Sequence, residues 1–247
     1  EDITELSGTD MLTGGYNRRG FIHNSENIFR HCADRTDYAV LYFNVRNFKA
    51  VNELFGIDTG DSVLRTIYKN LRSSSLKPCV VARVEADQFT CLVEKKNLDF
   101  DALSGLCEWN FTKKGKTMHI FCGCGIFFVE NKEMSINGMI DRAKLAKKYI
   151  TDEYVKPYNI YDASMKSYYI DRAELAGELR NGLAQEQFKV YYQPVVDAKT
   201  GEIRSAEALI RWVHPKRGFV SPAIFIPALE ESGHISELDF YVTKKVF

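Results

Sequence analysis

The run from Tyr191 to Glu230 carries the most information about how this chain folds. It reads Y-Y-Q-P-V-V at 191–196, G-E-I-R-S-A-E-A-L-I-R-W-V-H-P-K-R-G at 201–218 and S-P-A-I-F-I-P-A-L-E at 221–230. Its β-branched and aromatic residues predict a strand over Phe188–Val196 and a second strand over Ile203–Trp212. Helical spacing predicts a helix before them, over Ile170–Leu183, and another after them, over Pro222–Ser232.

This stretch resembles the opening of an EAL domain, a family that hydrolyses the bacterial messenger cyclic di-GMP. The tripeptide E-A-L alone would be uninformative, but the surrounding pieces fall in the family's order. These pieces are the Y-Y-Q-P strand, the W-x-H-P turn (Trp212, His214, Pro215), Gly218, and the F-I-P helix start (Phe225, Ile226, Pro227). The resemblance implies a (β/α)8 barrel with its site at the carboxyl ends of the strands.

The resemblance also implies roles for single residues of this stretch. In the family, two divalent ions activate water against a phosphodiester, and hard oxygen ligands suit Mg²⁺ or Mn²⁺. Glu207 matches one metal ligand and is expected at a strand end. Gln193 and Arg211 match positions that contact cyclic di-GMP, and Leu209 lies under the nucleotide. Without the resemblance, Gln193 would be an ordinary strand amide and Arg211 a surface ion pair. His214 is expected to pack beside Trp212 in a turn.

The EAL-like stretch is incomplete, because the chain ends at Phe247. A barrel of this kind takes roughly 250 residues, and the remaining metal ligands and the general base of the family come from later strands. We therefore expect that this chain by itself does not hydrolyse cyclic di-GMP. Its open strand edges should pack on the first domain, pair between chains or stay partly disordered.

The first part of the chain alternates strand and helix signals, which is typical of an α/β domain with helices packed on a central sheet. A turn over Asp10–Phe21 leads into a helix, and a further turn is expected over Gly56–Gly60. Strands are expected over Tyr38–Val45, Val80–Val84, Phe89–Val93 and Ile120–Val129, and helices over Phe48–Phe55, Val63–Leu71 and Ile136–Tyr149.

Several motifs of this part resemble the GGDEF family, the diguanylate cyclases that join two GTP molecules. The entry motif D-x-L-T-G-x-x-N-R-R-x-F spans 10–21, and F-K-x-x-N-x-x-x-G-x-x-x-G-D-x-V-L spans 48–64. The segment R-V-E-A-D-Q-F at 83–89 stands where the family has R-x-G-G-D-E-F. The resemblance covers roughly residues 8–160 and implies a nucleotide cyclase-like central sheet with flanking helices.

The cyclase chemistry implied by the family is changed at its centre. Phosphoryl transfer from GTP needs acidic oxygens that hold divalent metal against the triphosphate. The family's Asp at the end of the first strand is Asn44 here, and Glu85 and Ala86 replace two glycines of the signature turn. Asp87 is retained as a candidate metal ligand, but Gln88 replaces the next acid. We therefore expect cyclase activity to be absent or very weak.

Nucleotide binding by the first domain is a separate question from cyclisation. Asn52 and Asp61 match the family's guanine-reading pair, because an amide and a carboxylate together can complement the guanine edge. The alternative is structural, with Asn52 capping a helix and Asp61 starting one. Lys147 or Lys148 lies near the family's phosphate-contacting lysine, although a surface role is favoured. Residues 76–79, Leu-Lys-Pro-Cys, replace the R-x-x-D motif, so product feedback is expected to be missing.

The composition limits the classes of partner. The chain has 247 residues, 45% of them hydrophobic and 27% charged, with a formal net charge of zero. Such a balance is typical of globular domains and argues against a broad grip on nucleic acid or anionic lipid. No membrane segment or signal peptide is visible in the sequence. The six cysteines lack C-x-x-C hooks and indicate buried free thiols in a reducing, cytoplasmic compartment.

These observations together predict a two-domain organisation within a cyclic di-GMP signalling protein. We expect a degenerate GGDEF domain over 1–155, a linker over 156–169 and the first part of an EAL domain over 170–247. The leading hypothesis is that the parent protein hydrolyses cyclic di-GMP and that its first domain regulates this activity by binding GTP. A homodimer is a further expectation. The alternative is a catalytically inactive nucleotide-binding or protein-interaction module.

Overall fold

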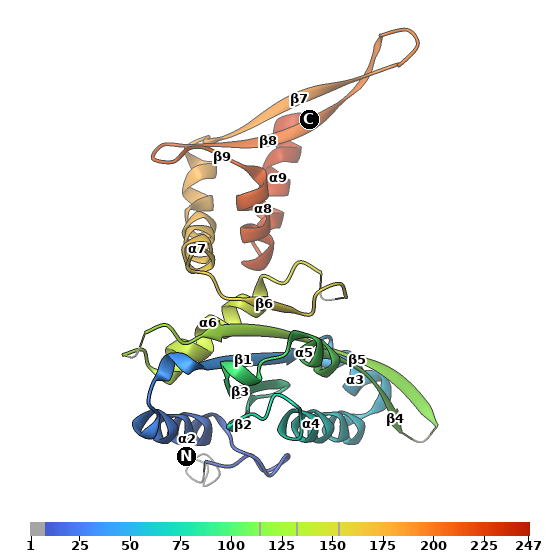
Figure 1. Ribbon diagram of the computed structural model, residues 1–247. Coiled ribbons are helices and arrows are strands. Elements are labelled where there is room, and N and C mark those ends of the chain that lie inside the picture. The colour runs from blue at the N-terminus through green and yellow to red at the C-terminus, as the bar shows by residue number, and fades with distance from the viewer. Residues whose placement is uncertain (1–7, 114, 132, 153) are drawn as a thin grey trace. The chain divides into compact units, whose positions relative to one another are not determined.

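The chain forms two compact units. The computed structural model describes residues 8–113, 115–131, 133–152 and 154–247. The first unit comprises Glu1–Met165 and the second comprises Lys166–Phe247. Figure 1 shows the elements of each unit along the chain.

The first unit is built from helices and strands that alternate along the chain. In order they are α2 (Arg18–His31), β1 (Tyr38–Val45), α3 (Phe48–Phe55), α4 (Ile57–Arg72), β2 (Val80–Glu85), β3 (Gln88–Glu94), α5 (Phe100–Cys107), β4 (Glu108–Lys113), β5 (Lys116–Phe128), α6 (Ile136–Lys148) and β6 (Tyr158–Ile160). The predicted strand over Tyr38–Val45 and helix over Phe48–Phe55 are confirmed to the residue.

A mixed sheet forms the centre of the first unit. Among the described residues it has six strands in the order β2-β3-β1-β5-β4, and β6 pairs with β5. The β5–β6 pairing is parallel and the others are antiparallel. Because β1 lies between β3 and β5, its carboxyl end is placed beside the β2–β3 turn, with Asn44 opposite Gln88. This juxtaposition positions the candidate site.

Helices cover both faces of the sheet, as the α/β pattern predicts. Alternate residues of β1 enter two different cores, because successive side chains of a strand point to opposite faces. Leu41 and Phe43 pack in a core that includes α4 and α5 residues. Val40 and Tyr42 pack in a second core with α2 and α6.

The sequence prediction of a turn over Gly56–Gly60 is wrong in its second half. Gly56 has a φ of 84° and ends α3, but α4 already begins at Ile57. Gly60 is buried inside α4, and a Cβ at that position would lie 1.9 Å from Oδ1 of Asn52. The glycine is thus needed for the close packing of α3 on α4 rather than for a turn.

The entry motif fixes the start of the first unit. Asp10 closes a turn by accepting hydrogen bonds from the backbone N–H and the hydroxyl of Thr13, at 2.8 and 2.7 Å. Asn17 caps α2 by accepting a hydrogen bond from the backbone N–H of Gly20 at 3.0 Å, as expected for a helix N-cap. The expected turn leading into a helix is confirmed.

The segment expected as a linker, 156–169, contains regular structure. Residues 158–160 form β6 and add a parallel strand to β5, from Cys124 opposite Tyr158 to Ile126 opposite Ile160. Helix α7 (Ala163–Ala184) begins soon after and continues through residue 169 into the second unit. The low periodicity of the sequence did not reveal β6, because so short a strand is specified by its partner β5.

The second unit packs helices against one end of an antiparallel sheet. Its elements are α7, β7 (Phe188–Val196), β8 (Ile203–His214), β9 (Gly218–Val220), α8 (Pro222–Glu231) and α9 (Ile235–Val246), with strand order β7-β8-β9. The core centres on Phe188, Trp212 and Phe225, which are all almost fully buried. Figure 1 shows the far part of the β7–β8 hairpin extending beyond the helices of this unit. The described residues form no closed barrel, consistent with a partial EAL domain.

Candidate functional site

An amide and a carboxylate meet at the end of β1. Nδ2 of Asn44 donates a hydrogen bond of 3.0 Å to Oδ2 of Asp87. Burial raises the pKa of Asp87, whereas the Asn44 bond and the nearby Lys147 and Arg83 act in the opposite direction. Asn44 and the candidate metal ligand Asp87 are therefore brought together, but as a donor–acceptor pair.

The signature turn next to Asp87 is held by an ion pair from the entry motif. Nη1 of Arg83 lies 3.1 Å from Oδ2 of Asp10, and its Nε donates to the carbonyl oxygen of Ala86 at 2.6 Å. Ala86 has a φ of 37°, in the left-handed region where a residue with a Cβ pays roughly 1–2 kcal/mol. Glu85 and Ala86 are both exposed. The turn thus keeps a backbone conformation that favours glycine, although Glu85 and Ala86 replace the family's glycines.

A cavity of about 580 Å³ opens beside Asn44. Its lining residues are Asn44, Val45, Arg46, Asn47, Lys147, Ile150, Thr151, Asp152 and Tyr154. Lys147 is half-buried and lines the cavity, whereas Lys148 is exposed. Of the two lysines, Lys147 lines the cavity beside β1 and Lys148 does not, and the spacing alone did not fix which of them α6 turns towards β1.

Arg46 is a cavity residue that the sequence pattern did not single out. Its guanidinium carbon lies 4.6 Å from the centre of the Tyr154 ring, within the range of a cation–π contact. Arg46 directly follows β1, two residues after Asn44. A charged residue just beyond a buried strand end was the available signal.

Asn52 and Asp61 lie inside α3 and α4, so neither caps a helix. The N-cap positions are Asn47 for α3 and Gly56 for α4, which removes the structural alternative. Oδ1 of Asn52 is buried and has no hydrogen-bond partner among the described residues. Such an unpaired acceptor costs about 1–3 kcal/mol.

Residues 76–79, which replace the family's feedback motif, differ in exposure. Leu76 is 2% exposed and belongs to the hydrophobic core between the sheet and α4. Lys77, by contrast, is exposed with a φ of 46°.

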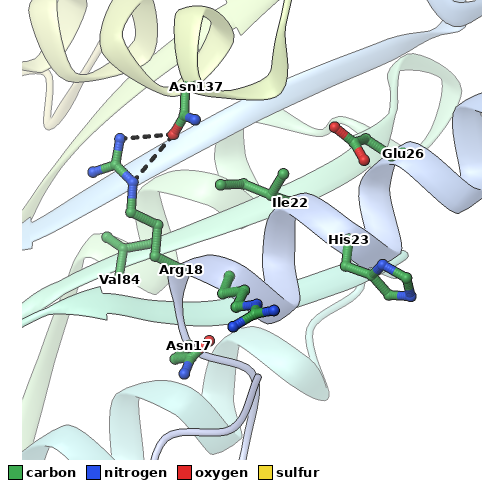
Figure 2. Close-up of a pocket in the computed structure, with 8 residues that line it drawn as sticks. Asn17, Arg18, Ile22, His23, Glu26, Val84 and Asn137 are labelled. Atoms are coloured by element: carbon green, nitrogen blue, oxygen red, sulfur yellow. Dashed lines mark hydrogen bonds between the residues drawn. The ribbon is translucent and has the colours of Figure 1, made fainter. Parts of the chain in front are cut away.

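A further cavity, of about 480 Å³, lies between α2 and α6 (Figure 2). The guanidinium of Arg18 donates to Oδ1 of Asn137 at 3.2 and 2.9 Å, which ties the entry motif to α6. Glu26 also lines this cavity. None of the site residues predicted from the sequence lies there.

The predicted residues of the second unit share one face of the β7–β8 ladder. Gln193 lies opposite Glu207, and Tyr191 lies opposite Leu209. Alternate residues of a strand point to the same side, so Arg211 joins Glu207 and Leu209 on this face. Core residues such as Trp212 point to the other face. The structure therefore brings Gln193, Glu207, Leu209 and Arg211 onto a single surface.

The sequence predicted that Glu207 lies at a strand end, but the structure places it inside β8. It is the fifth residue of β8, which continues to His214, and it is exposed. The strand extends further because Trp212 and His214 pair with β9. No group of three or more His, Cys, Asp or Glu side chains able to hold a metal ion occurs in the described part of the chain.

His214 has a structural role in the second unit. Its ring lies 5.5 Å from that of Trp212, as predicted. Nδ1 accepts hydrogen bonds from the backbone N–H groups of Lys216 and Arg217, both at 3.2 Å, and Nε2 contacts Oε2 of Glu178 on α7. These bonds fasten the turn after β8 to α7.

The fold and these residues define a cyclase-type α/β domain followed by the beginning of a phosphodiesterase-type domain. The family model "Diguanylate cyclase, GGDEF domain" matches residues 7–149, and the model "EAL domain" matches residues 176–247. The GGDEF match covers more than half of the chain, so the chain belongs to the GGDEF family, and an EAL segment follows that domain.

Two curated relatives match almost the whole chain. The cyclic di-GMP phosphodiesterase PdeR of Escherichia coli is 29% identical over 98% of this chain and 37% of its own length. The cyclic di-GMP phosphodiesterase NbdA of Pseudomonas aeruginosa is 26% identical over 98% of this chain and 32% of its own length. The chain thus spans about a third of the length of the curated relatives it matches.

A solved structure shares the fold of the chain. The S helix-GGDEF-EAL part of LapD from Vibrio cholerae, bound to c-di-GMP, aligns with a TM-score of 0.60 at 14% identity. The alignment covers 99% of this chain and 58% of that one. No helix among the described residues is long and apolar enough to cross a membrane.

Proposed function

We propose that the first unit is a regulatory domain that binds GTP but does not cyclise it. The guanine-reading pair is Asn52 and Asp61, since guanine presents N–H donors to a carbonyl oxygen and a carboxylate. The unpaired Oδ1 of Asn52 supports this role. Asn44 and Asp87 belong to the phosphate end of the same site.

The hydrogen bond between Asn44 and Asp87 carries the proposal that cyclisation is lost. A cyclase centre needs anionic oxygens on both sides of its metal ions. Here Asn44 brings no charge and its N–H group is directed at the one retained carboxylate, at 3.0 Å. Glu85 and Ala86 add side chains at the turn where the family has glycines. GTP can therefore be held without being activated.

We propose further that the whole protein hydrolyses cyclic di-GMP through its EAL domain. EAL domains are generally metal-dependent phosphodiesterases, and two relatives bear that name. The shared face of β7 and β8 supports Gln193, Leu209 and Arg211 as residues that contact cyclic di-GMP. Glu207 would supply one ligand to Mg²⁺ or Mn²⁺, which prefer carboxylate oxygen.

Calorimetric titration of GTP into the chain tests the nucleotide proposal. Wild type should bind GTP. Asn52→Ala should weaken binding by roughly tenfold, because the buried, uncharged hydrogen bond between Oδ1 of Asn52 and a guanine N–H is lost. Asn110→Ala, at an exposed asparagine on β4, is the matched control and should bind as wild type. Absence of heat with wild type, or equal affinity of Asn52→Ala, would contradict the proposal.

Turnover by the full-length protein tests the phosphodiesterase proposal. With Mg²⁺ or Mn²⁺ it should convert cyclic di-GMP to a linear product, and Glu207→Gln should reduce kcat by more than about a hundredfold through loss of a metal ligand. Lack of turnover by a full-length protein that binds cyclic di-GMP would favour a binding function instead.

A protein-interaction module is the second candidate function. The far part of the β7–β8 hairpin exposes Tyr191, Tyr192 and Ile203, the last at 70%. An exposed apolar hairpin of this kind favours protein contact. A full-length protein that neither binds nor cleaves cyclic di-GMP but forms a stable complex through this hairpin would support this candidate.

We also propose a homodimer and a cytoplasmic location. Members of the GGDEF family react across a two-fold interface, which motivates the dimer, and sedimentation of the full-length protein would decide it. The cysteines among the described residues form no disulfide, and four of them are buried. Free thiols persist in a reducing compartment, which supports the cytoplasm.

A further inference from the structure

The first unit departs from its family in how it can treat metal ions. A family cyclase centre holds divalent cations with clustered carboxylates, and Mg²⁺ in particular demands oxygen ligands in near-octahedral geometry. At the end of β1 this chain offers the Asn44–Asp87 pair, and the amide N–H occupies Oδ2 of Asp87. Gln88 adds no charge. Within the described residues no group of three candidate ligands forms. The residues present do not fit the metal.

Two side-chain cations line the cavity that adjoins this pair. Arg46 and Lys147 both line it. Lys147 is near enough to Asp87 to lower the pKa of that carboxyl against the effect of burial. Arg46 is held over the ring of Tyr154 at 4.6 Å, so its guanidinium has a defined position at the cavity wall.

The backbone adds to the positive character of the cavity. Asn47 lines the cavity and is the N-cap residue of α3. Its backbone is left-handed, and its side chain makes no capping hydrogen bond to the first turn of the helix. The N-terminal end of a helix favours anions, because its amide dipoles point outwards. Helix α3 thus begins at the cavity that holds Arg46 and Lys147.

Two carboxylates at or near the cavity already accept hydrogen bonds from the described residues. Oδ1 of Asp152 accepts hydrogen bonds from the backbone N–H groups of Tyr154 and Val155, at 2.9 and 3.3 Å. Asp87 accepts from Asn44. In each carboxylate, therefore, at least one of the two oxygens is already used and does not offer itself to a metal ion bound to phosphate.

From this arrangement we infer that the first unit binds a nucleoside polyphosphate without a divalent metal ion, through Arg46, Lys147 and the start of α3. This inference rests on the proposed GTP binding and names how the phosphates are held. In a metal-dependent site a divalent cation neutralises the phosphates. Here the two side-chain cations contact the phosphate oxygens directly, in charge-assisted hydrogen bonds.

Calorimetric titration of the 247-residue chain with GTP, in EDTA and in Mg²⁺, tests the inference. The dissociation constant in EDTA should lie within about threefold of that in Mg²⁺. In EDTA, Arg46→Gln and Lys147→Met should each weaken binding by roughly tenfold or more, because each removes a charge-assisted contact. Both substitutions keep much of the aliphatic stem. Lys148→Met, an exposed neighbour, should bind as wild type.

A variant that restores the family's acid provides a second readout. Asn44→Asp places a carboxylate beside Asp87 and a polyphosphate, so binding in EDTA should weaken several-fold and Mg²⁺ should strengthen it. Circular dichroism of each variant establishes that it is folded. The sensitivity to Mg²⁺ then separates an electrostatic effect from a loss of structure.

The outcomes distinguish this inference from the proposal on which it rests. GTP binding that requires Mg²⁺ would overturn the inference and leave the proposed GTP binding intact. Metal-free binding that Arg46→Gln and Lys147→Met do not change would also overturn it. No binding under either condition would overturn both.

Discussion

Gly125 in β5 marks a close approach of α6 to the sheet, and its replacement should be costly. A Cβ at Gly125 would lie 1.8 Å from the carbonyl oxygen of Ala143 and 2.6 Å from the backbone nitrogen of Lys147. Ordinary contact begins at 3.4 Å, so the shorter distance must grow by about 1.6 Å. Both atoms belong to the backbone of α6, so the helix itself must move.

We expect Gly125→Ala to destabilise the first unit by about 3 kcal/mol or more. Overpacking of a core typically costs about 1–3 kcal/mol, and a shift of a whole helix belongs at the upper end of that range. The same movement carries Lys147 away from Asn44, so GTP binding should weaken together with stability.

Tryptophan fluorescence can follow this effect in the first unit alone. The chain has two tryptophans, Trp109 in the first unit and Trp212 in the second. In a Trp212→Phe background, urea unfolding reports on Trp109. With a denaturant dependence of about 1–3 kcal/mol per molar urea, Gly125→Ala should lower the midpoint by roughly 1–3 M.

Gly105→Ala is the matched control for this experiment. Gly105 is exposed in α5, and a Cβ there would meet no atom within 4 Å. Alanine should stabilise this helix by about 0.5–1 kcal/mol. Equal midpoints for Gly125→Ala and its parent would refute the close packing of α6 on β5.

Three further substitutions test other parts of the account. Ala86→Gly should stabilise the first unit by about 0.5–1 kcal/mol, because relief of the left-handed strain exceeds the added chain entropy; a loss of stability in urea unfolding would contradict this. Gln187→Ala should cost the second unit about 1–3 kcal/mol, since it removes the acceptor of the buried indole N–H of Trp212, 3.0 Å away, and an unchanged midpoint would count against that bond. The bond from His214 lowers the pKa of Glu178 from its ordinary value of 4.5, so its stabilising effect should be present above that pH and be lost as pH falls through the lowered value. Glu178→Gln should therefore be less stable than wild type at neutral pH and equal to it in acid; a difference that does not depend on pH would rule out this linkage.

The sequence predicted much of the fold because local patterns and tertiary packing agree. The nearly continuous apolar run Tyr38–Val45 contributes successive side chains to two cores, one on each face of the sheet. The strands and the helix of the EAL-like stretch also follow their local patterns. The sequence did not predict the short strand β6, because its pairing with β5 specifies it and its own three residues do not.

For the candidate site, the sequence predicted which residues take part but not the contacts between them. Family motifs identified Asn44 and Asp87, but no pattern indicates that the amide donates to the carboxylate. That bond depends on the register between β1 and β3. Arg46 and Lys147 meet at one cavity only after α6 packs on the sheet, and their separation in sequence hides this.

The second unit shows the same limit. The sequence named Gln193, Glu207 and Arg211, yet the prediction of a strand end for Glu207 was wrong. Pairing of β8 with β9 extends the strand to His214, and that pairing depends on the turn fastened to α7. Which face the three residues share follows from strand register, which no single segment specifies.

Product formation from GTP by the purified chain tests the central claim most directly. Incubation with GTP and Mg²⁺ or Mn²⁺, followed by chromatographic separation of nucleotides, should show GTP unchanged and neither cyclic di-GMP nor its linear precursor. The expected reason is that Asn44 and Asp87 form a hydrogen-bonded pair in place of a metal-holding pair of acids. Steady accumulation of cyclic di-GMP that Asp87→Asn abolishes would contradict the account.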